Sequence, residues 1–247
     1  MAKQHYHHGE LRTALLDAAE ALVRERGVDG WSLREASARV GVSSSAAYHH
    51  FASRDVLVRA LSGRVLSQLG ERMSHAAGLV TDPGASVDPQ RRLVAVGRCY
   101  VHWALQDPSV AHLAFGAGTS GPGTEISPHP HDVLDAELDR LVEAGALAPS
   151  ARSGADFVVW AAIHGLATLL ADGLAQLDSQ QAIAREAERV VRAVLAGLGQ
   201  ETAPSQDWPA VRSTHTERRT ERQGGDSAIQ SPANAPAQPE DRPQAPG

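Results

Sequence analysis

The stretch SLREASARVGVSSSAAYHHF, residues 32–51, decides the fold of this chain. Ser32 is followed three residues later by Glu35, a capping-box pattern that predicts a helix beginning at Leu33. Apolar residues then recur at helical spacing, so they share one face. Gly41 is the predicted end of this helix, because glycine adopts the left-handed conformation needed there at little cost.

A second helix is predicted directly after this turn, and its exposed side chains carry the functional signal. Ser43 is a suitable N-cap, so the helix should run from Ser44 to about Phe51. Two helices joined by a short turn with a glycine form a helix-turn-helix. If Ala47 and Phe51 face the core, hydroxyl, phenol and imidazole groups remain on the other flanks. Such a helix is typical of those that enter the DNA major groove. A small surface hairpin without a ligand is the alternative.

The flanking sequence extends this hairpin into a larger helical unit. Before it, apolar residues from Leu11 to Leu22 recur at helical spacing in a helix predicted to end near Arg26. After it, Ser53 caps a longer fourth helix. Residues 9–69 are therefore predicted to form a three-helix DNA-binding domain, with the helix-turn-helix at 32–51.

The run from Gly41 to Arg54 resembles the TetR family of bacterial transcriptional regulators. The family pattern is Gly-Val-Ser, three variable residues, a hydrophobic residue, Tyr-x-His-Phe and a basic residue soon after. Here it reads Gly-Val-Ser at 41–43, Ser-Ser-Ala at 44–46, Ala-Tyr-His-His-Phe at 47–51 and then Arg54. The resemblance implies an all-α, homodimeric repressor with a variable C-terminal ligand-binding and dimerisation domain.

The resemblance also implies roles for individual residues. Those expected to hold DNA phosphates are Ser43, Tyr48, His50 and Arg54. Those expected nearest the bases are Ser44, Ser45, Ala46 and His49, and the predicted DNA-binding set also includes Ser32. This sequence departs from the family pattern at Ser45, where many members have Gly, and at Ala47, where many have Leu. Both replacements are small, so they affect the choice of operator and leave the fold unchanged.

Charge is divided along the chain in a way that suits this assignment. The net charge is −6, but residues 1–75 carry 10 lysines and arginines against 8 acidic residues, while residues 76–200 carry 8 against 14. The acidic excess therefore lies outside the predicted DNA-binding domain. An N-terminal arm near the DNA backbone, from Lys3, His5, His7, His8 and Arg12, and a solvated start to the chain are equal alternatives.

The composition limits the classes of protein to which the chain can belong. The chain has 247 residues, and 42% of them are hydrophobic, enough for a buried core. No apolar run reaches the roughly 18 residues of a membrane span. No apolar signal region precedes the first helix, so a cytoplasmic protein is expected. Cys99 stands alone, which excludes an intrachain disulfide and favours a small buried apolar residue.

Residues 70–200 are predicted to form the helical ligand-binding and dimerisation domain, for about nine helices in all. Asp-Pro pairs at 88–89 and 107–108 predict two helix starts. Residues 116–130, rich in Gly and Pro, are expected to form a mobile loop, and a helix follows from 131 to 144.

The last two predicted helices, about 151–172 and 179–198, carry the dimerisation signal. The first is apolar nearly all round, so it should be buried on several sides. The second has one broad apolar stripe. A four-helix interface about a two-fold axis is predicted from them, with an ordinary monomer core as the alternative. Trp160 to Gly165 resembles a Trp-x-x-x-His-Gly motif of one TetR C-terminal subgroup. Residues 201–247 hold seven of the fourteen prolines and are predicted to be disordered.

An effector pocket is predicted where aromatic and polar residues lie on facing helices, with plain core packing as the equal alternative. The predicted lining residues are Tyr100, Trp103, Phe115, Leu138, Trp160 and His164. The twelve histidines lack metal-ligand spacing with a carboxylate partner, so neither a metal nor a cofactor is expected.

A regulator is therefore expected rather than an enzyme, since no phosphate-binding glycine loop and no nucleophile elbow are found. The expected partners are a palindromic double-stranded DNA operator, a second copy of the chain and an unknown small-molecule effector, with no membrane. The alternative is a helical enzyme or binding module whose N-terminal helices serve only in dimerisation.

Overall fold

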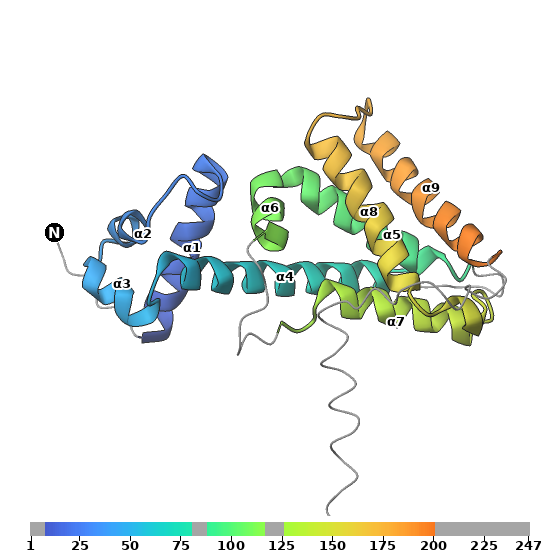
Figure 1. Ribbon diagram of the computed structural model, residues 1–247, viewed down its shortest axis with the longest axis horizontal. Coiled ribbons are helices and arrows are strands. Elements are labelled where there is room, and N and C mark those ends of the chain that lie inside the picture. Colours follow the sequence, from blue (N-terminus) through green and yellow to red (C-terminus); the bar gives the residue numbers. More distant parts are fainter. Residues whose placement is uncertain (1–7, 81–87, 117–125, 201–247) are drawn as a thin grey trace, which may run out of the picture. The chain divides into compact units, whose positions relative to one another are not determined.

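The structure is a computed structural model that describes residues 8–80, 88–116 and 126–200. Over these residues the chain is all-α, as predicted (Figure 1). The nine α-helices are α1 (His8–Arg26), α2 (Leu33–Val40), α3 (Ser44–His50), α4 (Arg54–Gly78), α5 (Arg91–Gln106), α6 (Pro108–Gly116), α7 (Pro130–Glu143), α8 (Ala155–Ala171) and α9 (Gln180–Leu198). A 3-10 turn, Pro149–Ala151, precedes α8. The predicted tail at 201–247, the N-terminal arm up to His7 and most of the loop at 116–130 lie outside the described residues.

Local capping fixes the start of α2 and α3, as the sequence predicts. The Glu35 N–H donates to the Ser32 hydroxyl at 3.3 Å, and the Ser32 N–H donates to the Glu35 carboxylate at 2.9 Å. Gly41 ends α2 with a φ of +80°. The Ser43 hydroxyl then accepts from the Ala46 N–H at 3.2 Å. These contacts join neighbours in sequence, so the helix-turn-helix is encoded locally.

Helix α4 is shared between the two predicted domains. It packs against α1 near its beginning and against α5, α6 and α7 further along. The boundary predicted between residues 69 and 70 therefore lies inside a continuous helix. Because α4 follows α3 directly, a shift of α4 would also move α3.

Two helices of the C-terminal part begin later than predicted. The Asp88 carboxylate accepts from the Gln90 N–H at 3.0 Å, so Asp88 forms a turn and α5 begins at Arg91. Helix α8 begins at Ala155 because Gly154 is left-handed, with a φ of +75°. The inward face of α5 carries Leu93, Val96, Tyr100 and Trp103, which are buried.

Helix α8 corrects one prediction, because it is not buried on several sides within one chain. Only one face, marked by Ala155, Val159, Ile163 and Ala167, is buried. Among the described residues, α8 packs against α5, α7 and α9, and the side turned away from these helices carries exposed side chains. Phe157, Val158 and Leu169 remain 44%, 43% and 47% exposed there. On α9, the residues Ala187, Val191 and Leu195 of the apolar stripe are buried within one chain.

A close approach at Gly70 yields a stability prediction. A Cβ atom at this position of α4 would lie 2.0 Å from the Pro128 carbonyl oxygen, a backbone atom that cannot swing away. Gly70→Ala is expected to cost about 3 kcal/mol, because overpacking a well-packed site forces the backbone to move. For a chain of this size that lowers the Tm by roughly 10 °C. Thermal unfolding followed by circular dichroism measures it.

Gly78 is the matched control on the same helix, because a Cβ there would meet nothing within 4 Å. Gly78→Ala should leave the Tm unchanged or raise it slightly. Equal Tm values for the two variants would contradict the close packing of α4 against Pro128.

In the parts of the chain placed by the structure, no helix combines the length and the apolar character that crossing a bilayer requires. The same parts hold no group of three or more His, Cys, Asp or Glu side chains arranged to bind a metal.

Candidate nucleic-acid interface

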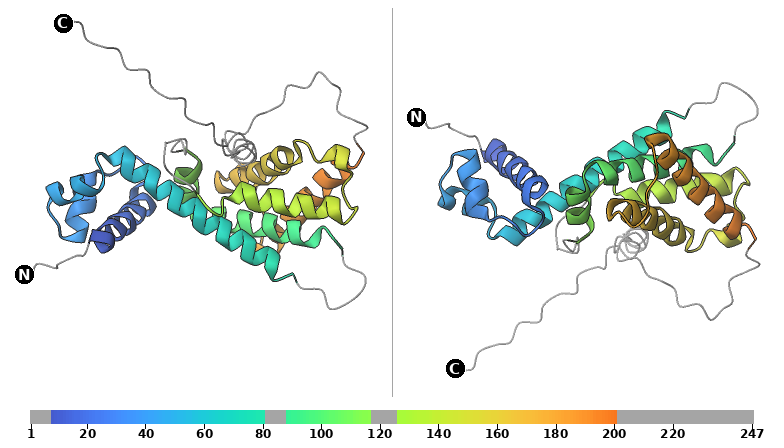
Figure 2. Two further views of the ribbon diagram at one scale, coloured as in Figure 1. Left: turned by 90° about the horizontal axis from the view of Figure 1, so that it is seen from below. Right: turned by 90° about the horizontal axis from the view of Figure 1, so that it is seen from above.

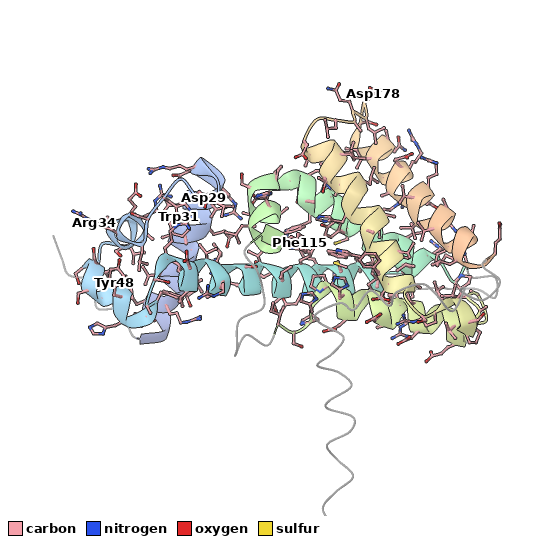
Figure 3. All side chains as sticks on the ribbon, in the orientation of Figure 1. Asp29, Trp31, Arg34, Tyr48, Phe115 and Asp178 are labelled. Atoms are coloured by element: carbon pink, nitrogen blue, oxygen red, sulfur yellow. The ribbon has the colours of Figure 1, made fainter. Side chains whose placement is uncertain are left out.

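Helix α3 turns its apolar residues inward and its polar residues outward. Ala47 is fully buried, and Phe51, directly after the helix, is 1% exposed. On the outer side Tyr48 is 54% exposed, and Ser45 and His49 are exposed as well. Figure 3 shows Tyr48 on the surface of α3. The predicted outward set thus forms a continuous polar face, with Ser44, Ala46 and His50 half-buried at its edges.

The two N-cap serines differ in whether their hydroxyl groups can still donate a hydrogen bond to DNA. The Ser43 hydroxyl accepts from the Ala46 N–H, so its own proton is available to a phosphate oxygen. The Ser32 hydroxyl both accepts from the Glu35 N–H and donates to the Glu35 carboxylate at 3.0 Å. Its hydrogen-bonding capacity is therefore used within α2, and it supports the interface by starting that helix.

The Arg54 side chain packs against the loop between α1 and α2 and does not belong to the polar outer face of α3. Its Nε donates to the Trp31 carbonyl at 3.0 Å, and a second guanidinium nitrogen donates to the Val28 carbonyl. The guanidinium carbon lies 4.7 Å from the centroid of the buried Trp31 ring. Arg54 thus fixes the loop between α1 and α2 onto α4. The family resemblance placed Arg54 among the phosphate contacts. Its hydrogen bonds to residues 23 and 26 positions away could not be read from the local sequence.

This geometry predicts the effect of Arg54→Gln. The change removes a cation that serves two carbonyls and an aromatic ring, so we expect a loss of about 2 kcal/mol. The Tm should then fall by roughly 4–8 °C. Arg59→Gln is the control, because Arg59 is exposed on the same helix. If both variants melt at the same temperature, Arg54 does not hold the loop.

Sequence reasoning missed Arg34, an exposed cation in the first turn of α2 (Figure 3). Two neighbouring arginines are neutralised, since Arg26 pairs with Glu35 at 2.7 Å and Arg39 pairs with Glu25 at 2.7 Å. The Arg26 guanidinium also holds the pKa of Glu35 below its usual range. Arg34 makes no such pair with any residue that the structure places. A cation is unfavourable at a helix N-terminus, and this was the signal available in the sequence.

Arg12, a candidate for the N-terminal arm, belongs instead to helix α1. Its guanidinium carbon lies 5.1 Å from the centroid of the Phe51 ring. Arg12 therefore lies beside the end of α3 and is held there by helix α1.

The residues predicted to line an effector pocket come together as a cluster of rings. The Tyr100 hydroxyl lies 2.7 Å from His164 Nδ1. Ring centroids are 5.0 Å apart for Tyr100 and Trp160, and 5.2 Å apart for Phe115 and His164. The Trp103 ring centroid lies 5.9 Å from the Tyr100 ring centroid, so Trp103 belongs to the same cluster. Leu138 is buried in the core on α7. We call Tyr100, Trp103, Phe115, Trp160 and His164 the ring cluster.

Two further histidines, considered in the sequence only as metal ligands, extend the ring cluster. The His131 and Trp160 ring centroids are 4.5 Å apart, and His129 stacks on His131 at 5.4 Å. Burial raises the pKa of Tyr100 and lowers the pKa of His164. Both groups are therefore uncharged at neutral pH, and the cluster favours neutral, planar, hydrogen-bonding partners.

Two cavities lie beside the ring cluster rather than within it. One, of about 720 Å³, is lined mainly by residues of α4, α5 and α9, together with Val80 and Asp88, and by none of the predicted pocket residues. The other, of about 230 Å³, touches one of them, Trp103. The rings pack against one another, so an effector entering there must displace side chains.

Comparisons with known proteins agree with this geometry. The model of bacterial regulatory proteins of the tetR family matches residues 15–61, and the model of the tetracyclin repressor-like C-terminal domain matches residues 93–194. No curated protein sequence matches the chain.

Solved structures match along most of the chain. A protein of unknown function from Rhodococcus sp. RHA1 is 30% identical, with a TM-score of 0.61, over 80% of this chain and 100% of the other. A proposed transcriptional regulator from Pseudomonas aeruginosa PAO1 is 23% identical, with a TM-score of 0.61, over 79% and 95%. RolR in complex with resorcinol is 18% identical, with a TM-score of 0.53, over 80% and 96%.

Proposed function

The chain belongs to the TetR family and is a DNA-binding transcriptional regulator, and we propose that it acts as a homodimeric repressor released by a small molecule. Members of this family are regulators and not enzymes, which rules out the helical-enzyme alternative. The observation that carries the proposal is the polar outer face of α3, held by a buried Ala47 and Phe51. We further propose that its C-terminal domain belongs to the Trp-x-x-x-His-Gly subgroup.

We assign the DNA contacts to two kinds of residue. Ser44, Ser45, Ala46 and His49 lie toward the base edges, where short side chains let the helix approach closely. The phosphate contacts come from Ser43, Tyr48 and His50, and Arg34 joins them as an exposed cation. Arg54 and Ser32 support these contacts by holding α1, α2 and α4 together.

The second copy of the chain covers the exposed apolar face of α8. Phe157, Val158 and Leu169 lie on this face, and Gly165 offers open space for a close helix contact, since a Cβ there would meet nothing within 4 Å. Exposed apolar surface of this kind commonly marks a site of interaction with another protein. A two-fold axis through α8 and α9 would place two copies of α3 on successive half-sites.

The ring cluster is the proposed effector site. Phe115, Trp160 and His164 are each only partly buried, so a planar ligand inserted among them would bury more aromatic surface. The Tyr100 hydroxyl and His164 offer a hydrogen-bonding pair to it. RolR, which shares the fold, binds the phenol resorcinol. A neutral aromatic effector carrying hydroxyl groups is the class that suits these groups.

A polar contact connects this site to the DNA-binding helices. Asp107, directly before α6, accepts from Arg24 Nε of α1 at 2.5 Å, and Phe115 of the ring cluster lies on α6. Movement of α6 on effector entry would therefore pull on α1 as well as on α4. The effector regulates only if it binds the two arrangements with different affinity.

A reporter gene fused to the DNA upstream of the coding region tests repression. Transcription should rise when the gene is deleted and fall again when the wild-type gene is restored. A panel of phenols should raise transcription in the wild type and leave a Trp160→Ala strain repressed. Lower transcription in the deletion strain would instead identify an activator, and no change would leave the upstream DNA without a role as operator.

A further inference from the structure

The cavity of about 720 Å³ is a groove that the proposed function does not use. It lies where α5 packs against both α4 and α9 (Figure 2). Its described lining residues include none from α8 and none from the ring cluster. The groove is therefore distinct from the exposed face of α8 and from the proposed effector site.

The interior of the groove is apolar. Val94, Ala95 and Cys99 of α5 line it together with Ile183 and Ala184 of α9. Val94 is buried and the other four residues are half-buried, so part of their apolar surface still meets water. An apolar segment that covered this surface would be held there by the hydrophobic effect.

The charges at the rim of the groove are matched within the fold. Arg192 contacts Asp88 at 2.6 Å and Glu188 at 2.8 Å. Arg98 contacts Glu188 at 2.5 Å, and Arg91 also has a partner. Hydrogen bonds from Arg192 hold the pKa of both carboxyls below the usual range, so both are ionised. A rim of matched charges favours neither an anion nor a cation, and an uncharged apolar occupant fits it best.

The sequence beyond α9 contains one segment with this character. Residues 207–211 read Asp-Trp-Pro-Ala-Val, and Trp208 is the only tryptophan, tyrosine or phenylalanine after Leu198. Val211 and Ile229 are the only large aliphatic residues in 201–247, and Val211 belongs to the same segment. A tryptophan buries about 150 Å² or more when it enters a pocket. The four residues from Trp208 to Val211 are uncharged and suit the apolar interior.

The connecting chain is long enough for this segment to reach the groove. Helices α5 and α9 run antiparallel beside it, so the end of α9 lies near the start of α5, where Arg192 contacts Asp88. Ala184, near the middle of the groove, precedes Leu198 by fourteen residues, which is about 21 Å along a helix. Trp208 follows Leu198 by ten residues, and an extended chain of that length spans about 33 Å.

We propose that the groove between α4, α5 and α9 is the docking site of residues 207–211 of the same chain. Trp208 would lie between Ala95 and Ala184, where the short alanine side chains leave room for its ring. The docked segment would connect the chain beyond α9 to three helices of the C-terminal domain. It would also cover the apolar interior of the groove.

The connection to α9 favours docking even if the segment itself binds weakly. A short tether gives an effective concentration of about 1 mM. An intrinsic Kd of about 0.1 mM would then leave roughly one chain in ten undocked.

Cys99 reports whether the groove is occupied, because it lines the groove and is the single cysteine of the chain. The rate of its reaction with N-ethylmaleimide is measured on the full-length protein. Trp208→Ser should raise this rate about tenfold, since only the undocked form exposes the thiol. The wild-type rate should not depend on protein concentration. A rate that falls as the concentration rises would identify a second copy of the chain as the occupant and overturn the proposal.

Ile229→Ser is the matched control, because it removes the other large apolar residue of 201–247 and leaves 207–211 intact. Its rate should equal that of the wild type. A free peptide of residues 205–213, added at several millimolar to the Trp208→Ser protein, should restore slow labelling. The same peptide carrying Trp208→Ser should not.

Equal labelling rates for the wild type and Trp208→Ser would overturn the proposal, and so would an equal acceleration by Ile229→Ser. Circular dichroism checks that both variants are folded, and the peptide protects Cys99 only if the groove itself binds the segment. None of these measurements involves DNA or an effector, so they succeed or fail independently of the repressor function.

Discussion

Leu169→Glu is expected to convert the protein from a dimer to a monomer and to abolish operator binding. Leu169 is 47% exposed in one chain, on the face of α8 that we assign to the interface. A two-fold axis places the new carboxylate in the interface twice. If each unpaired buried charge costs about 3 kcal/mol, the dimer dissociation constant rises by roughly 10⁴-fold. Sedimentation velocity at micromolar concentration measures the change.

Leu79→Glu is the matched control, since Leu79 is 67% exposed just after α4 and lies outside the proposed interface. This variant should remain dimeric and keep its operator affinity. The interface assignment is wrong if Leu169→Glu sediments as the wild type does, or if both variants dissociate equally. Loss of dimer should also reduce DNA affinity, because one copy of α3 reaches only one half-site.

Tyr48→Ala is expected to weaken operator binding by about 10²-fold or more. The side chain is 54% exposed, so the change leaves the core intact, and the Tm should stay within the small range of surface substitutions. A hydrogen bond from the phenol to a charged phosphate oxygen is worth about 1.5–3 kcal/mol, and a dimer loses two of them. Fluorescence anisotropy with a labelled duplex measures the affinity.

Two further variants distinguish a residue that positions the protein on DNA from one that reads the base sequence. Tyr48→Phe keeps the ring and should lose nearly as much affinity, if the hydroxyl is the group that binds. Tyr48→Ala should weaken binding to all duplexes by a similar factor, because a phosphate contact carries no sequence information. His49→Ala should instead alter which sequences are preferred. A Tyr48→Ala protein with wild-type affinity would remove Tyr48 from the interface.

The helix-turn-helix could be predicted from the sequence because its determinants are local. Ser32, Glu35, Gly41 and Ser43 act on neighbours within a few residues, and each behaves as predicted. The role of Arg54 could not be predicted in this way. Its partners are the carbonyls of Val28 and Trp31, and only the packing of α1 and α2 on α4 brings them within reach.

The C-terminal part shows the same division between local pattern and tertiary contact. The apolar composition of α8 predicted an extensive buried surface, but a single sequence cannot tell whether its own chain or a second copy covers each face. The convergence of Tyr100, Trp160 and His164 could be predicted from facing helices. The cavity lined by residues of α4, α5 and α9 could not, because it depends on contacts between residues far apart in the sequence, such as Arg192 with Asp88, 104 residues apart.

The measurement that tests the central claim most directly is a titration of the protein against duplex DNA from upstream of its coding region, at two salt concentrations. The account predicts salt-sensitive binding of two protomers to one palindromic site, because α3 reads each half-site while neighbouring groups bind phosphates. Failure to retain any duplex, or retention that is indifferent to both salt and sequence, would contradict it.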